Sequence, residues 1–282
     1  MDALFTKPAG PQASNNRFAL GLNPGILLRG LSLWIVFLVG MFLATQVLSL
    51  QWGFDYQKGL VRLFHLDREN NIPSWYSSVA LGLAALVLVI IAQVEQTRES
   101  ASARAWWILA ALFLYLSMDE AASIHEMLIG VVTPLLKQAG LFAGFLTYSW
   151  VVVGIPLVGI VALTFRRFLA ALPYDTRWLF IFAGGLFVAG AIGIEMIGAQ
   201  VESTIGTREA MVYVVVVTLE EGCEMFGIAL FLYALLSHLN RHENRRQLSR
   251  LIDSEGGLSK SDIEGKHQFP QSLPPSHKTR AA

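Results

Sequence analysis

The chain has 282 residues, of which 54% are hydrophobic and 15% are charged, and its mean hydropathy is +0.51. Soluble domains are about 45–50% apolar and about 25% charged, so this composition excludes a soluble enzyme and a disordered chain. The 21 Lys and Arg balance 21 Asp and Glu, which leaves no basic surplus for binding nucleic acid. We therefore expect an integral membrane protein in a lipid bilayer, in the cytoplasmic membrane if the source is bacterial.

Six apolar stretches are each long enough to cross a membrane. About 20 mostly apolar residues span the roughly 30 Å of hydrocarbon as a helix. The sequence therefore predicts an all-α, polytopic bundle of about six transmembrane helices. The predicted spans are residues 25–50, 75–94, 105–130, 141–165, 178–201 and 210–239.

The Lys and Arg residues predict that both termini lie inside. With the N-terminus inside, 16 of the 21 fall in inside segments and five fall outside, in agreement with the positive-inside rule. Residues 1–24 then form a cytoplasmic segment. In the outside loop 51–75, Leu60, Val61 and Phe64 have helical spacing, which predicts an interfacial helix. The polar segment 241–282 contains prolines and serines and is predicted to be a disordered cytoplasmic tail.

Carboxylic acids within three of the predicted spans are the most informative feature. Each charged group near the centre of a membrane helix costs about 2.5–3.5 kcal/mol. No Lys or Arg lies beside them in these stretches. We therefore expect them to be protonated, solvated in a cavity, or neutralised by bound cations. They are Asp119, Glu120, Glu126, Glu195, Glu202, Glu220, Glu221 and Glu224.

Helical spacing gathers these acids into stripes. Residues seven positions apart lie about 20° apart around a helix, as for Asp119 with Glu126 and for Glu195 with Glu202. The three acids of the last span share one arc by spacings of three and four. With the predicted topology, all three stripes lie in the middle to outer half of the bundle. The sequence therefore predicts one convergent buried site.

We favour a metal-binding site, such as the di-metal centre of a membrane oxidoreductase. Inward-facing carboxylates on packed helices hold two ions in ferritin-like bundles, and oxygen ligands with one imidazole suit iron or manganese. Two divalent cations would also offset four negative charges. The spans lack the Glu-x-x-His pairs of ferritin-like sites, which weighs against this hypothesis. The candidate ligands are Asp119, Glu120, His125, Glu126, Glu195, Glu220, Glu221 and Glu224.

Two alternatives stay open at this point. The acids could form a relay in a proton- or cation-coupled transporter, although the sequence has no repeat and no pair of interrupted helices. They could also join helices in an accessory or structural subunit. Whether the chain is an enzyme, and which subunits accompany it, differs between these hypotheses. Haem is disfavoured because only His125 lies deep in a predicted span, and no glycine loop suits a nucleotide.

Overall fold

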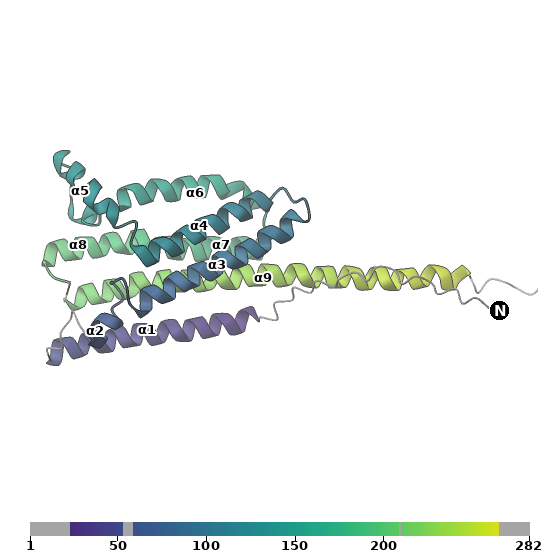
Figure 1. Cartoon of the computed structure of the whole chain (residues 1–282), viewed down its shortest axis with the longest axis horizontal. Coiled ribbons are helices and arrows are strands. Elements are labelled where there is room, and N and C mark those ends of the chain that lie inside the picture. The colour runs from purple at the N-terminus through teal and green to yellow at the C-terminus, as the bar shows by residue number, and fades with distance from the viewer. Residues whose placement is uncertain (1–22, 53–58, 209, 265–282) are drawn as a thin grey trace, which may run out of the picture. The chain divides into compact units, whose positions relative to one another are not determined.

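The structure is a computed structural model that describes residues 23–52, 59–208 and 210–264. Side chains are described over these residues up to 241, except for 50–52. Every regular element in this described part is a helix (Figure 1), which confirms the all-α prediction. The chain divides after Leu239 into two compact units, and the fold below is that of the first.

Two helices begin at asparagine caps that the sequence provides. The Asn23 side chain accepts a hydrogen bond of 2.9 Å from the amide of Gly25, and Asn71 accepts one of 3.1 Å from the amide of Ser74. The helices are α1 Pro24–Trp52, α2 Gly59–Leu63, α3 Ile72–Gln96, α4 Ala103–Ala122, α5 Met127–Gln138, α6 Val151–Ala171, α7 Tyr174–Val188, α8 Glu195–Ile205 and α9 Met211–Glu264, with the short 3₁₀-helix η1 Gly144–Leu146 before α6 and the π-helix η2 Ala189–Ile194 between α7 and α8.

The long helices lie side by side and alternate in direction (Figure 1). α3 and α4 make the most extensive contact. α7, η2 and α8 follow one another without a loop, so that the fifth long helix contains a π-helical segment. The short helices α2 and α5 and the end of α8 lie at one end of the bundle, which is called the α2/α8 end below. The charge distribution predicts that this end faces outside.

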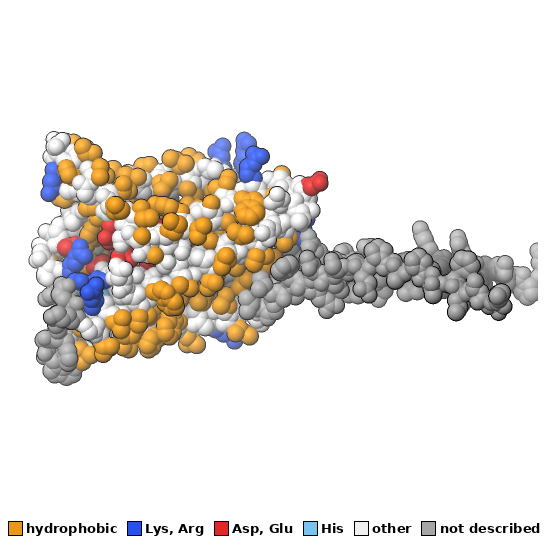
Figure 2. Space-filling view, viewed as in Figure 1, with side chains coloured by type: hydrophobic (Ala, Val, Ile, Leu, Met, Phe, Trp, Pro, Cys, Tyr) orange, Lys and Arg blue, Asp and Glu red, His pale blue; other side chains and the backbone are white. Residues whose placement is uncertain are grey.

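Five helices are long and apolar enough to cross a membrane: α1, α3, α4, α6 and the continuous α7–η2–α8 segment. Apolar side chains cover much of the visible surface (Figure 2), as expected for contact with lipid. The sixth predicted span is the first part of α9 and is not among the five. The count of six spans and the location of both termini inside therefore stay predictions.

Aromatic packing joins the helices at the other end of the bundle. The buried Trp106 ring of α4 meets Phe168 of α6 edge-on at 4.9 Å between ring centroids, and Phe180 of α7 at 5.9 Å. Phe113 of α4 stacks on Phe231 of α9 at 4.5 Å. Such ring pairs contribute about 0.5–1.5 kcal/mol beyond the burial of their area. This core fixes the four helices that also surround the candidate site.

Several predicted boundaries were wrong. The span predicted over residues 105–130 ends at Ala122, because Ser123 has a φ of 51° that no α-helix continues through. The span predicted over 141–165 instead occupies Val151–Ala171.

Two segments outside the apolar spans are partly described. Val61 and Phe64, in and just after α2, are buried, with Phe64 edge-on to Phe37, whereas Leu60 and Leu63 are exposed. The interfacial position of this helix therefore stays a prediction. α9 continues to Glu264, through the first part of the segment expected to be disordered. Residues 241–264 contain four Arg, three Glu and three Leu, which favour helix, and proline returns only at Pro270. Residues 265–282 lie outside the described residues.

Candidate functional site

A cavity of about 230 Å³ lies among α3, α4, α6, η2 and α9. All eight predicted site residues line it, and they come from three separate parts of the chain. Figure 2 shows Asp and Glu side chains emerging between apolar ones near the α2/α8 end. Among the described residues, nine carboxylic acids contribute to the wall, together with the basic side chains of Arg68 and His125. The acids are Asp67, Glu69, Asp119, Glu120, Glu126, Glu195, Glu220, Glu221 and Glu224.

The end of α4 positions Asp119 and His125 against each other. One carboxylate oxygen of Asp119 accepts a hydrogen bond of 2.8 Å from the amide of His125, and the other lies 2.9 Å from its Nδ1. Asp119 therefore closes the turn that follows Ala122 as well as orienting the imidazole. Glu126 lies beyond this turn, so the expectation that Asp119 and Glu126 share one helical face was wrong. The turn brings both to the same cavity nonetheless.

Trp150 connects the α4 turn to α8. Its indole Nε1 donates a hydrogen bond of 2.8 Å to Glu195, the first residue of α8. Its ring packs edge-on against that of His125, with 4.9 Å between centroids. Glu195 follows directly on the π-helical η2, and π-helical segments frequently occur at functional sites. Two site residues from distant parts of the sequence are thus held by one tryptophan.

The three acids of α9 lie where the π-helix packs most closely on α9. A Cβ atom added at Gly190 would lie 2.7 Å from the carbonyl oxygen of Glu220 and 2.8 Å from Cγ of Glu224. Glycine is therefore required at this position for the two helices to approach. Glu221 and Glu224 lie deep in the protein. Each is still partly accessible to solvent, as expected for residues that line a cavity.

Four acids on the wall that lie within α4 and α9 lack a protein partner. Within the described part of the chain, the side chains of Glu120, Glu220, Glu221 and Glu224 make no hydrogen bond or ion pair with another residue. Buried polar groups are nearly always hydrogen-bonded, to protein or to water. These carboxyl groups are therefore available to water, protons or a ligand in the cavity.

A closed circuit of polar contacts lies beside the cavity at the α2/α8 end. Arg208 Nε donates to Glu202 at 2.7 Å, and its Nη1 donates to Asp67 at 3.3 Å. The Tyr148 hydroxyl donates to Glu202 and lies 2.9 Å from the hydroxyl of Tyr213, which donates to Asp67 at 3.1 Å. The Arg208 guanidinium also lies over both tyrosine rings. Asp67 belongs to this circuit and to the cavity wall, whereas Glu202 belongs only to the circuit.

Burial shifts the pKa values of titratable groups outside the spans. It raises the pKa of Asp67 to about 6, although Arg208 and Tyr213 act in the opposite direction. It raises the pKa of Glu69 to about 7, with the charge of Glu126 adding to the shift. Burial lowers the pKa of His125, but the hydrogen bond and charge of Asp119 outweigh it and leave that pKa above its ordinary value. Protonation of this region therefore changes near neutral pH.

The side-chain arrangement does not support the predicted metal centre. In the described part of the chain, no three His, Cys, Asp or Glu side chains are grouped so that they could hold a metal ion. The predicted ligands share a cavity, but they are distributed around its wall. Helical spacing predicts which direction a side chain takes, and it does not predict whether side chains from different helices converge to coordination distance.

Sequence reasoning missed several residues of the site. Asp67 and Glu69 come from the loop predicted to lie outside, where acids are usually solvated, and Trp150 precedes a helix by one residue. The sequence did contain a signal for Asp67 and Glu69. With Arg68 they form a run of three charged residues directly after buried Leu66, in the loop next to the outer half of the bundle, where the other acids were predicted to lie. His65, in the loop after α2, and His238, near the end of the span predicted over 210–239, are also buried, with 2% and 4% of their surface exposed.

Residues 33–239 match the model of a family described as a domain of unknown function, DUF8692. The match covers most of the chain and all of the cavity wall, so the chain belongs to this family. Neither the curated proteins nor the solved structures contain a match to it.

Proposed function

We propose that the acid-lined cavity is a cation site of a proton-coupled membrane transporter, in which a cation and protons compete for the same carboxylates. The observation that carries this proposal is that nine acids line one cavity in an apolar bundle, and that Glu120, Glu220, Glu221 and Glu224 lack a protein partner in the described part. Unpaired charges are unfavourable within a bilayer. Carboxyl groups in such a place are expected to hold a proton or a positive ligand and to exchange one for the other.

Two further features support transport over a di-metal centre. The lining donors are spread around the wall without a group that could hold a metal ion. The π-helical η2 interrupts the α7–α8 span beside Glu195, and transporter sites are commonly built at interruptions of membrane helices. An iron or manganese centre is the competing hypothesis, and metal content distinguishes it.

Reconstitution into liposomes tests the proposal. With a pH-sensitive dye inside the vesicles, an inward gradient of sodium, potassium or tetramethylammonium should drive protons out through the wild-type protein. Glu220→Gln and Glu224→Gln imitate the protonated acids and should reduce the flux to that of protein-free vesicles. Glu99→Gln is the matched control, because Glu99 is an exposed acid in the α3–α4 turn, away from the cavity.

Two results would overturn the proposal. One is an absence of proton movement for all three cations in vesicles that contain folded protein. The other is a metal content of at least about one equivalent of iron or manganese in purified wild-type protein that is lost in Glu220→Gln. This result would restore the di-metal hypothesis, and bound metal should then also stabilise the folded state.

A further inference from the structure

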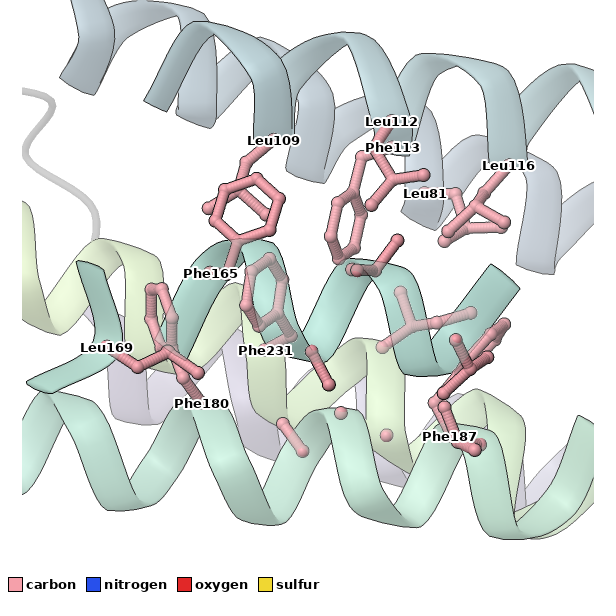
Figure 3. A pocket seen from close by; sticks show the side chains of 18 of the residues that line it. Leu81, Leu109, Leu112, Phe113, Leu116, Phe165, Leu169, Phe180, Phe187 and Phe231 are labelled. Carbon is pink, nitrogen blue, oxygen red and sulfur yellow. The ribbon is translucent and has the colours of Figure 1, made fainter. Parts of the chain in front are cut away.

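A second cavity, of about 270 Å³, adjoins the acid-lined one. Its wall is built entirely from Leu, Phe, Val, Ile, Ala and Gly side chains of α3, α4, α6, α7 and α9. Figure 3 shows the labelled side chains turning toward a shared space, among them Phe113, Phe165, Phe180 and Phe231. A cavity lined only by apolar side chains suits an apolar ligand.

The two cavities share part of their walls. Leu81, Leu116, Leu157, Val158, Phe187 and Val188 line both of them. Along α4, Asp119 of the acid-lined cavity and Leu109 of the apolar cavity are ten residues apart, or about 15 Å at 1.5 Å per residue. The acid-lined cavity therefore lies nearer the α2/α8 end, and the apolar cavity lies next to it on the side of the aromatic core. Together the cavities reach the size of small-molecule sites, about 300–1,000 Å³.

We infer that the two adjoining cavities together bind a single-chain amphiphile with a cationic head, whose head lies among the carboxylates and whose alkyl chain lies in the apolar cavity. The polarity of the walls carries this assignment. Glu220 and Glu224 lack a protein partner within the described part, so a positive head replaces the missing counter-charge. The adjoining wall offers no polar group, so only an apolar chain is complementary to it. This inference rests on the proposed cation site and names its ligand class.

Two neighbouring glycines of α7 allow a matched test. Gly184 lines the apolar cavity, and a Cβ added there meets no atom within 4 Å. Gly185 has the same open surroundings and does not line the cavity. Gly184→Leu should therefore fill the space for the alkyl chain, whereas Gly185→Leu adds the same side chain to the same helix outside it.

The experiment measures binding of radiolabelled dodecyltrimethylammonium to the full chain in phosphatidylcholine nanodiscs, with protein-free nanodiscs subtracted. Unlabelled dodecyltrimethylammonium should compete at roughly tenfold lower concentration than tetramethylammonium or dodecyl maltoside, which share only its head or its chain. Gly184→Leu should weaken binding roughly tenfold, with Gly185→Leu unchanged. Glu224→Gln should weaken binding of the long-chain cation and leave the weak competition by dodecyl maltoside unchanged.

Tetramethylammonium separates this inference from the proposed function. If tetramethylammonium binds as tightly as dodecyltrimethylammonium in the wild type, or if the two leucine variants bind the long-chain cation equally, the amphiphile site is refuted while the cation site stands. If neither cation binds to folded wild-type protein, both fail. Because the comparison of competitors uses the wild type, it holds even if Gly184→Leu does not fold.

Discussion

The hydroxyl of Tyr213 donates a hydrogen bond of 3.1 Å to Asp67, a residue 146 positions earlier in the chain. Tyr213 is buried near the start of α9, and Asp67 lies in the loop between α2 and α3. The contact joins the helix that carries three cavity acids to a loop that lines the same cavity. The α2/α8 end of the site is thus held by a polar circuit whose single cation among the described residues is Arg208.

Replacing Arg208 by Gln should destabilise the protein. The change removes both ion pairs and leaves Glu202 and Asp67 without their cation. Because the Arg208 side chain is 42% exposed, we expect a loss of about 1–2 kcal/mol, below the 3–5 kcal/mol for a fully buried pair. Thermal unfolding in detergent measures it as a Tm lowered by several degrees. Lys137→Gln is the control, because it removes a cation that lies outside the circuit. Lys137 lies over the ring of Phe142, 5.0 Å from its centroid. Equal shifts for both variants would contradict a structural role for the circuit.

Glycine at position 190 should be required for α9 to pack on the π-helix. Gly190→Ala places a Cβ against the backbone oxygen of Glu220, which cannot move aside, and overpacking of this kind costs about 1–3 kcal/mol. Gly193→Ala lies in the same π-helical segment with open space around it and should be neutral or slightly stabilising. Unfolding midpoints in denaturant compare the two. Alanine tolerated equally at both positions would rule out the close approach.

The raised pKa of Glu69 predicts a pH dependence of stability. The folded pKa of about 7 exceeds the ordinary 4.5, so the folded state binds the proton more tightly. The contribution of this proton binding to the free energy of unfolding is fully present below about pH 4.5 and is lost as the pH rises through 7. Glu69→Gln should remove this loss and raise Tm at pH 8 by about 2–4 °C. This corresponds to a gain of about 1 kcal/mol in the free energy of unfolding, reduced because solvent screens the partly exposed group. At pH 4.5 the two proteins should unfold at similar temperatures. A Tm difference that is the same at both pH values would argue against titration of Glu69.

Asp119 should control the protonation of His125. Asp119→Asn keeps a hydrogen-bond acceptor near the ring and removes the charge, so the pKa of His125 should fall, because burial then dominates. Glu126→Gln removes a more weakly acting charge and should lower that pKa less. Titration of the imidazole carbon resonance by NMR, with His125 assigned from its own substitution, reports both values. The reverse order of the two variants would show that Glu126 is the main partner.

The sequence was sufficient to predict an all-helical chain with apolar helices long enough to cross a membrane. The apolar runs and the helical spacing of Glu220, Glu221 and Glu224 are local patterns, and the positive-inside rule supplied their relative depth. These patterns placed eight residues that the structure finds on one cavity wall. They do not depend on how the helices are rotated in detail against one another.

What depends on tertiary contacts could not be predicted in this way. The end of α4 is set by Asp119, which accepts a hydrogen bond from the amide of His125 beyond the helix, and no periodicity reports such a turn. Trp150 joins Glu195 across 45 positions, and Asp67 reaches the cavity from a loop. Whether carboxylates converge on a metal ion depends on rotations of a few tens of degrees between helices. Spacing along each helix leaves these rotations free.

The most direct test of the central claim is the number of protons released when a cation binds. Wild-type protein in weakly buffered nanodiscs is titrated with dodecyltrimethylammonium and with tetramethylammonium while the pH is recorded. If cations and protons share the carboxylates of the cavity, binding should release about one proton or more per cation near pH 7, and Glu220→Gln with Glu224→Gln should reduce that release. Cation binding without any proton release, or equal release from wild-type protein and the double variant, would contradict the claim.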